Sequence, residues 1–501
     1  MAADKQSLVA RADHETLYGT IPLLRRDRIY GFWDLIFVAG SFAVATWCYV
    51  QGATLASVVN FWQAFAATLG PLMAAGVIVA LVGVIATRYG IDHWIYQRAV
   101  FGYVGVLVIA LVAIVATWGW YAINAQLFGQ AMQKVLVAGG ANVTDGWVKP
   151  LALACVFIGW LLAMGGPAGV AWSTRIMAPM LFGVGLLVLV MVIVKGHATI
   201  FSAGPVGSAP HTSGSIESYS LAVEWNVAFA LGWYPTIGAI TRLVKTERKA
   251  HWGLWLGFQF CMVFFIMIAV ATALLMAPLL EGGLSTDPTD YLLELGGPWF
   301  GVLSLFVIAL ANITTMTVAT YALTVAAKIL RPTWNYRVVG TVGALWCALL
   351  TSWGGIWDRY PTFLAITGLL AGPALALILA DYFFVRRQHI SLRSMYDLKH
   401  GSYRYTYGFN VPAIIAFGAG ITAFLLVYDP FNYVVRSSLF HYTTATGLAA
   451  AVAALAYVLM AQIPAVKRYL TRDATEPAVT VLDEEAAVGA LATAEAYEGA
   501  A

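Results

Sequence analysis

The sequence has few charged residues for its length. Of its 501 residues, 11% are Asp, Glu, Lys or Arg, whereas 60% are hydrophobic. A soluble domain carries about 25% charged residues, so this chain lacks the polar surface needed to face water on all sides. Apolar runs of about 18 residues or more recur along the chain, and each is long enough to cross a hydrocarbon core of about 30 Å. The composition therefore excludes an ordinary soluble protein.

These apolar runs also lack the alternation of polar and apolar residues that marks the strands of a membrane β-barrel. Lipid offers no hydrogen-bond partners to the backbone, so an unalternating apolar span must be helical. We therefore expect an all-α integral membrane protein.

Cysteine and histidine are scarce, with four and eight residues. The cysteines lie inside apolar runs, with no spacing typical of a zinc site or a redox pair, and we interpret them as small buried hydrophobes. The histidines lie mostly in loops and termini, and no metal-ligand spacing or Ser/His pairing occurs at membrane depth. The sequence thus gives no support for a membrane-embedded enzyme, and we expect no catalytic residues and no cofactor.

Twelve membrane-spanning helices fit the apolar runs. We expect them at about 31–51, 62–87, 104–128, 149–165, 174–195, 219–240, 252–278, 299–326, 337–352, 362–385, 410–428 and 444–463. If the N-terminus is cytoplasmic, five of the 28 Lys and Arg residues fall outside: Lys134, Lys149, Lys195, Arg359 and Arg436. The excess of positive charge inside supports this count and orientation.

Three regions follow from this map. Residues 1–30 form a polar cytoplasmic segment, residues 31–465 the transmembrane domain, and residues 466–501 a cytoplasmic tail rich in Ala and Glu. We expect a multi-pass protein of the inner (plasma) membrane with both termini in the cytoplasm. Its expected partners are the lipid bilayer, a small-molecule substrate and a coupling cation, with no nucleic acid, and we expect a monomer.

Two spans contain residues that interrupt a helix. In the sixth span, Gly232 and Trp233 are followed by Pro235, which removes a helical hydrogen bond. In the first span, Gly40 and Ser41 precede a mixed segment that includes Val44 and Trp47. Breaks at matching places in two halves of a chain are typical of transporters built from inverted repeats. A simple proline kink is the alternative.

The third and eighth spans carry candidate binding residues. Trp120 and Asn124 are four residues apart and share one face of a helix, where an indole and an amide suit a flat, hydrogen-bonding ligand. In the eighth span, Ala311, Thr314 and Thr315 also share a face, and their oxygens could bind a monovalent cation. The alternative for the third span is a set of ordinary interfacial aromatic residues. The alternative for the eighth span is a set of hydroxyls that hold helices together.

Glu224 is the one carboxylate that we place well within a span. An acid inside a membrane is by default a candidate functional residue. Its possible roles are a proton carrier, a partner for a cationic substrate, or a structural acid near the outer interface.

Several motifs resemble the nucleobase:cation symporter-1 family. Arg88-Tyr89-Gly90-Ile91, followed by Arg98-Ala99-Val100-Phe101-Gly102, resembles its R-x-G-I-P…R-x-x-F-G signature, although Asp92 replaces the proline. Gly119-Trp120-Tyr121-Ala122-Ile123-Asn124 resembles its G-W-F-G-x-Q motif, and Ala311-Asn312-Ile313-Thr314-Thr315 its A-x-x-[ST]-T stretch. Thr241-Arg242 resembles the end of D-F-T-R, with Ala239 in place of the acid.

This resemblance implies a five-plus-five inverted-repeat fold, like that of sodium-coupled amino-acid transporters, with two extra helices. It implies symport of a nucleobase-like compound with Na⁺ or H⁺ by alternating access. By position, Trp120 and Trp233 would stack on the substrate, beside Gly232 and Trp47.

The resemblance also assigns roles to the remaining candidates. Asn124 and Thr320 stand where the family places substrate-binding amides, and Glu224 remains a candidate contact. The cation would lie between carbonyls near Val44 and Trp47 and the eighth span at Ala311, Thr314 and Thr315.

Two departures put the usual substrates of the family in question. Asn124 is shorter than the glutamine of the family motif, and Thr320 cannot offer an amide. Changes of this kind in a hydrogen-bonding site alter substrate choice strongly. The alternatives to a cation-coupled symporter are a proton-coupled carrier of a cationic, guanidinium-type compound and a passive channel or facilitator.

Overall fold

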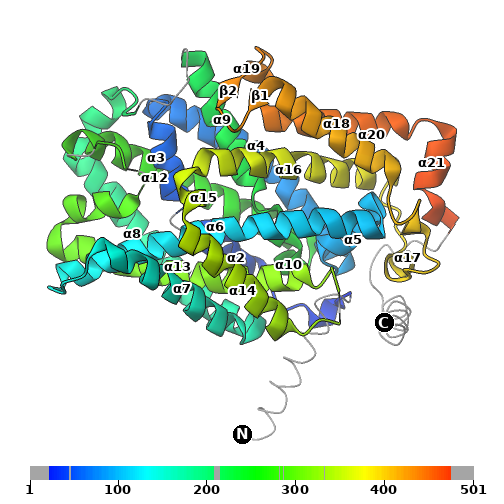
Figure 1. Ribbon diagram of the computed structural model, residues 1–501, viewed down its shortest axis with the longest axis horizontal. Helices are drawn as coiled ribbons and strands as arrows, with labels where there is room; N and C mark the ends of the chain where they lie inside the picture. Colours follow the sequence, from blue (N-terminus) through cyan, green and yellow to red (C-terminus); the bar gives the residue numbers. More distant parts are fainter. Residues whose placement is uncertain are drawn as a thin grey trace, which may run out of the picture.

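The computed structural model describes residues 22–43, 47–207, 215–280, 283–285, 287–331 and 333–475. Across these residues the chain is almost entirely helical (Figure 1). One two-residue hairpin, β1 (Tyr428–Asp429) with β2 (Val434–Val435), is the only sheet within the described ranges. The predicted all-α class agrees with this architecture.

The helices follow one another with short connections. In the first half they are α2 (Phe32–Ala43), α3 (Trp47–Ala56), α4 (Phe61–Tyr89), α5 (His93–Phe101), α6 (Tyr103–Ala138), α7 (Val148–Ala163), α8 (Gly166–Ser202), α9 (Ser215–Leu231), α10 (Ile237–Thr241), α11 (Glu247–Trp255) and α12 (Cys261–Met276). In the second half they are α13 (Pro288–Ala327), α14 (Tyr336–Trp353), α15 (Gly355–Asp358), α16 (Tyr360–Leu379), α17 (Leu392–Tyr396), α18 (Val411–Val427), α19 (Phe440–Thr443), α20 (Ala445–Met460) and α21 (Pro464–Leu470).

Short 3₁₀ and π segments lie between or extend these helices. The 3₁₀ segments are η1 (Arg25–Asp27), η2 (Asp145–Trp147), η3 (Tyr234–Thr236), η5 (Ala277–Leu279), η7 (Ser402–Arg404) and η8 (Arg472–Thr475), and the π segments are η4 (Leu256–Phe260) and η6 (Ala380–Val385).

Each of the twelve predicted spans coincides with helix in the described part of the chain. Seven helices there are long and apolar enough to cross a membrane unaided, and an eighth arises if α20 and α21, bent by 106°, form one span. The other predicted spans are broken, shorter or less apolar: α2 with α3, α9 with α10, α14, and α18.

The predicted break of the sixth span is observed, whereas that of the first span falls largely outside the described residues. The sixth span ends as α9 at Leu231, passes through the 3₁₀ turn η3, and resumes as α10. The first span consists of α2 and α3, which end and begin on either side of residues 44–46, a stretch outside the described residues. Val44, a predicted cation ligand, is therefore not placed.

The long helices run roughly along one direction in the view of Figure 1, with α6 crossing the centre of the molecule. The most extensive packing joins α6 to α13 and α18 to α20, while α3 packs on α12 and α4 on α9. Both broken spans thus lie among the long helices, which cover them. The start of the predicted tail also packs against the body, since Leu470 and Asp473 are buried.

Candidate functional site

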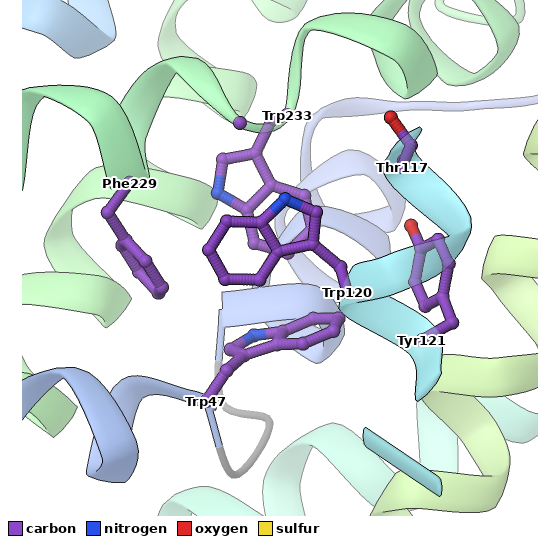
Figure 2. A pocket seen from close by; sticks show the side chains of 7 residues that line it. Trp47, Thr117, Trp120, Tyr121, Phe229 and Trp233 are labelled. Carbon is purple, nitrogen blue, oxygen red and sulfur yellow. The ribbon is translucent and has the colours of Figure 1, made fainter. Parts of the chain in front are cut away.

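Three tryptophans from three separate elements meet in the interior. Trp47 begins α3, Trp120 lies in the middle of α6, and Trp233 lies at the break after α9 (Figure 2). The Trp47 ring lies edge-on to the other two, with centroids 6.2 Å from Trp120 and 5.3 Å from Trp233. All three side chains are buried.

A small cavity lies between these rings. Its volume is about 10 Å³, room for about one water molecule, and it is lined by Trp47, Thr117, Trp120, Tyr121, Phe229, Gly232 and Trp233. A second cavity of about 30 Å³ shares Thr117, Trp120 and Gly232 and extends to Pro235 and the α16 residue Thr367. The Trp120 indole thus lines both cavities, and both cavities border the broken sixth span.

The break in the sixth span gives the site its shape. A Cβ at Gly232 would lie 3.2 Å from the Phe229 carbonyl oxygen and 3.4 Å from Trp120 Cζ2, so the backbone packs closely on the indole here. Trp233 follows directly, and its ring stacks on Phe258 with centroids 4.8 Å apart and planes inclined by 21°. Phe258 belongs to the π segment η4, so an irregularity in the next span supports the indole.

A hydrogen-bonded polar network lies behind Trp120. Tyr360, whose ring contacts Trp120, donates to Gln51 Oε1 at 2.9 Å. Gln51 donates to Asn226 Oδ1 at 3.1 Å, and Asn226 donates in turn to the carbonyl of Ala67. These side chains are buried and come from α3, α9 and α16, so the network fixes both broken spans relative to α16.

The structure brings four of the seven predicted substrate contacts together: Trp47, Trp120, Gly232 and Trp233. Asn124 lies one turn beyond Trp120 but does not line the cavity; its amide donates to the Asn312 carbonyl of α13 at 2.9 Å. Its Oδ1 and the Thr320 hydroxyl are buried without a hydrogen-bond partner. Thr320 does not line either cavity.

The predicted cation residues lie where α13 meets the end of α2. Thr315 donates a hydrogen bond to the Ser41 carbonyl at 3.3 Å, which joins the eighth span to the first near the end of α2. Thr314 instead donates to Leu310 in its own helix at 3.3 Å. Ala311 is buried on the same face. The oxygens here are uncharged, which suits a hard monovalent cation rather than a transition metal.

Glu224 lies away from the aromatic cavity. Its carboxylate accepts the backbone N–H of Thr446 at 3.0 Å and the Thr446 hydroxyl at 2.5 Å, at the first turn of α20. Of its three predicted roles, this geometry favours the structural one, because the hydrogen bonds hold α9 against α20.

Sequence reasoning did not select several residues of the site. Phe229 and Thr117 each precede a predicted residue by three positions, so helical spacing from Gly232 and Trp120 was a usable signal. Tyr121 was visible in the same motif as Trp120. Gln51, Asn226 and Tyr360 carried no signal, since their contacts join distant parts of the chain.

Most of the chain matches one known protein family. The family described as permeases for cytosine/purines, uracil, thiamine and allantoin matches residues 24–461. The chain belongs to this permease family. It is therefore a multi-pass membrane transporter and not an enzyme, and the resemblance inferred from its motifs is confirmed.

Curated relatives of this permease are distant. The purine-uracil permease NCS1 of Arabidopsis thaliana is 24% identical over 74% of this chain, which spans 64% of that protein. The hydantoin permease of Microbacterium maritypicum is 22% identical, with 81% of this chain and 84% of that protein covered. The allantoin permease of Bacillus subtilis is 23% identical, with 73% and 77% covered.

Solved transporters share the fold. Mhp1, a nucleobase-cation-symport-1 family transporter in a closed conformation with bromovinylhydantoin bound, matches with a TM-score of 0.73 at 18% identity, over 95% of this chain and 98% of that chain. A Na⁺-coupled sialic acid symporter matches with a TM-score of 0.59 at 14% identity, again over 95% and 98%. These likenesses confirm the predicted five-plus-five transporter core with two further helices.

Proposed function

We propose that this permease is a cation-coupled symporter of a nucleobase-like, flat nitrogen-containing ring compound and works by alternating access. The observation that carries the proposal is the convergence of Trp47, Trp120 and Trp233 at the break of the sixth span. Indole faces bind flat rings by stacking, and interrupted helices expose backbone groups to a ligand.

The substrates for which the relatives are named support this class of ligand. Purines, uracil, hydantoin and allantoin are all small nitrogen-rich ring compounds or ureides. The cavity between the tryptophans is small, so a ligand of this size would displace Trp120 toward the adjoining space next to Thr367.

We place the coupling cation between α2 and α13. The Thr315 hydroxyl already reaches the Ser41 carbonyl, and Thr314, the preceding residue of α13, carries a second hydroxyl. A cation bound there would hold the two halves of the transporter together, and coupling requires only a few kcal/mol of differential affinity between states. We further propose a monomer in the plasma membrane with cytoplasmic termini.

The alternatives receive less support from the site. A carrier of cationic compounds needs a carboxylate near the substrate. The carboxylate of Glu224 instead accepts hydrogen bonds from Thr446. A passive facilitator gives no role to the contact between the broken first span and Thr315.

Thermal stabilisation of the purified full chain tests the proposal. Uracil, adenine, hydantoin and allantoin are added separately in sodium chloride or in choline chloride, because a ligand of the folded state raises the melting temperature by mass action. We expect one of them to stabilise the protein, and more so with sodium.

A pair of variants makes the test specific to the site. Stacking on a base contributes about 1–3 kcal/mol, so Trp120→Ala should raise the Kd of that compound about fivefold or more. Trp118→Ala is the matched control, because Trp118 lies two residues away on α6 and packs against Gly343 of α14. Equal weakening by both variants would contradict the assignment of the site.

A further inference from the structure

A buried acid–histidine pair lies at the junction between α5 and the broken sixth span. Asp92 precedes α5 and His93 begins it, on the side of the molecule that we expect to face the cytoplasm. Both side chains are buried, at 4% and 0% exposure. They lie outside the substrate cavity and outside the predicted cation residues.

His93 Nδ1 faces two partners that demand opposite protonation states. The backbone N–H of Gly238 in α10 donates to this nitrogen at 3.1 Å, which requires an unprotonated Nδ1. The same nitrogen lies 2.9 Å from Asp92 Oδ1, a contact that becomes a charge-assisted hydrogen bond when Nδ1 carries a proton. One nitrogen atom cannot accept a hydrogen bond from Gly238 and donate one to Asp92 at the same time. Protonation of His93 Nδ1 therefore replaces its hydrogen bond from Gly238 with one to Asp92.

This exchange of hydrogen bonds affects α10, because α10 packs directly on the pair. A Cβ at Gly238 would lie 2.3 Å from His93 N, 2.4 Å from His93 Nδ1 and 2.6 Å from Asp92 Oδ1. The backbone of the second half of the broken span thus rests directly on the pair. Losing the hydrogen bond to Gly238 loosens that contact, while Trp94 hydrogen-bonds to both Asp92 and the Pro235 carbonyl nearby.

The groups around His93 can stabilise an added proton. Asp92 Oδ2 and His93 Nε2 are buried without hydrogen-bond partners. The rings of Trp94 and Tyr234 lie 4.8 and 5.3 Å from the His93 ring, and aromatic faces attract cations.

Other charged groups near the pair come from α5, from the residue after α10 and from α17. Arg98, Arg242 and Asp92 all lie near the Tyr396 phenol of α17. Asp92 also lies near the Tyr234 phenol, which donates to Gln97 of α5. Asp381 accepts a hydrogen bond from Tyr96, and Arg98 lies over the Tyr103 ring.

We propose that Asp92 and His93 form a proton-binding site whose protonation releases α10 from α5. The inference rests on the proposed function only where it treats this junction as part of the alternating-access machinery. In that setting the pair makes opening of this side of the permease sensitive to pH.

Hydrogen–deuterium exchange at the Gly238 amide tests the proposal without any substrate. The purified full chain in detergent is measured across about pH 5 to 8, the range in which histidines change charge, and rates are corrected for intrinsic exchange. Loss of one hydrogen bond of about 1 kcal/mol predicts a roughly fivefold drop in protection as the pH falls.

Three variants make the result specific. His93→Gln, which cannot be protonated, should show protection that does not vary with pH. Asp92→Asn keeps the imidazole but removes its charged partner, so the drop in protection should be smaller. His251→Gln is the matched control, because this α11 histidine lies away from the pair, and it should behave like the wild type.

Constant protection in the wild type, or an unchanged drop in both His93→Gln and Asp92→Asn, would overturn the proposal. Because no substrate is present, either result leaves the proposed transport function standing. Conversely, failure to find a transported compound does not affect the exchange result.

Discussion

At the scale of single residues, Glu224 shows how burial and neighbours decide the role of a carboxylate. Its position inside a span made it a candidate for substrate or proton binding. The structure gives both of its oxygens to Thr446, whose N–H and hydroxyl lie at the first turn of α20. A carboxylate at the start of a helix is stabilising because the unpaired N–H groups there carry partial positive charge.

We expect Glu224→Gln to lower stability rather than change substrate preference. Loss of a charge-assisted hydrogen bond costs about 1.5–3 kcal/mol, which thermal unfolding of the purified protein measures as a lower Tm. Glu217→Gln, earlier on α9, is the matched control and should change Tm less. A variant with normal Tm but altered ligand binding would show instead that Glu224 reaches the substrate.

Thr315 is the residue whose hydroxyl joins the eighth span to the first. Thr315→Val keeps the shape of the side chain and removes the oxygen, so we expect sodium to lose its enhancement of ligand-dependent stabilisation. Thr317→Val is the control, because the Thr317 hydroxyl donates to Ile313 within its own helix at 2.8 Å. Undiminished sodium enhancement in Thr315→Val would remove this residue from the cation site.

The sequence predicted individual site residues best where a local motif held them. Trp120 and Trp233 follow glycines in recognisable segments, and both line the cavity. Asn124 was placed by spacing from Trp120, yet its amide turns to the Asn312 carbonyl, because side-chain direction depends on which helix packs alongside. Tertiary contacts of this kind have no sequence signature.

At the scale of elements, glycine and proline indicated where the sixth span breaks, and α9 ends at Leu231 directly before Gly232. The π segment η4 was not predicted, because Leu256–Phe260 has an ordinary apolar helical composition. Its importance appears only in three dimensions, where Phe258 stacks on Trp233. A local irregularity therefore supports the site from a neighbouring span.

The junction between the end of α16 and η8 also depends on buried charges. Arg386 donates to Asp381 at 2.8 Å and to Asp473 at 2.6 Å, and all three side chains are buried. Removing one partner from a buried ion pair costs about 3–5 kcal/mol because the remaining charge loses its compensation. The segment that ends the described chain is thus held by electrostatics as well as packing.

We expect Asp473→Asn to lower Tm by several degrees and to increase hydrogen exchange in α21. Asp397→Asn is an isosteric control, because Asp397 is more exposed and accepts mainly backbone N–H groups. Equal effects of the two substitutions would contradict the structural role assigned to the buried pair.

At the scale of the whole molecule, hydrophobic runs and the distribution of Lys and Arg predicted where the helices lie. The fold comparison confirms the resulting core. Hydropathy alone recovers seven or eight of the spans within the described residues, because the remaining helices are interrupted, shorter or less apolar. Among these, the sixth span borders the proposed site through Gly232 and Trp233.

The most direct test of the account is uptake into proteoliposomes that contain the purified protein. The radiolabelled compound identified by thermal stabilisation is supplied outside, with an inward sodium gradient, an inward proton gradient, or neither. We predict that a cation gradient drives accumulation above the external concentration, and that Trp120→Ala abolishes it while Trp118→Ala does not. Equilibration to the external concentration under every gradient would contradict cation-coupled symport and identify a facilitator.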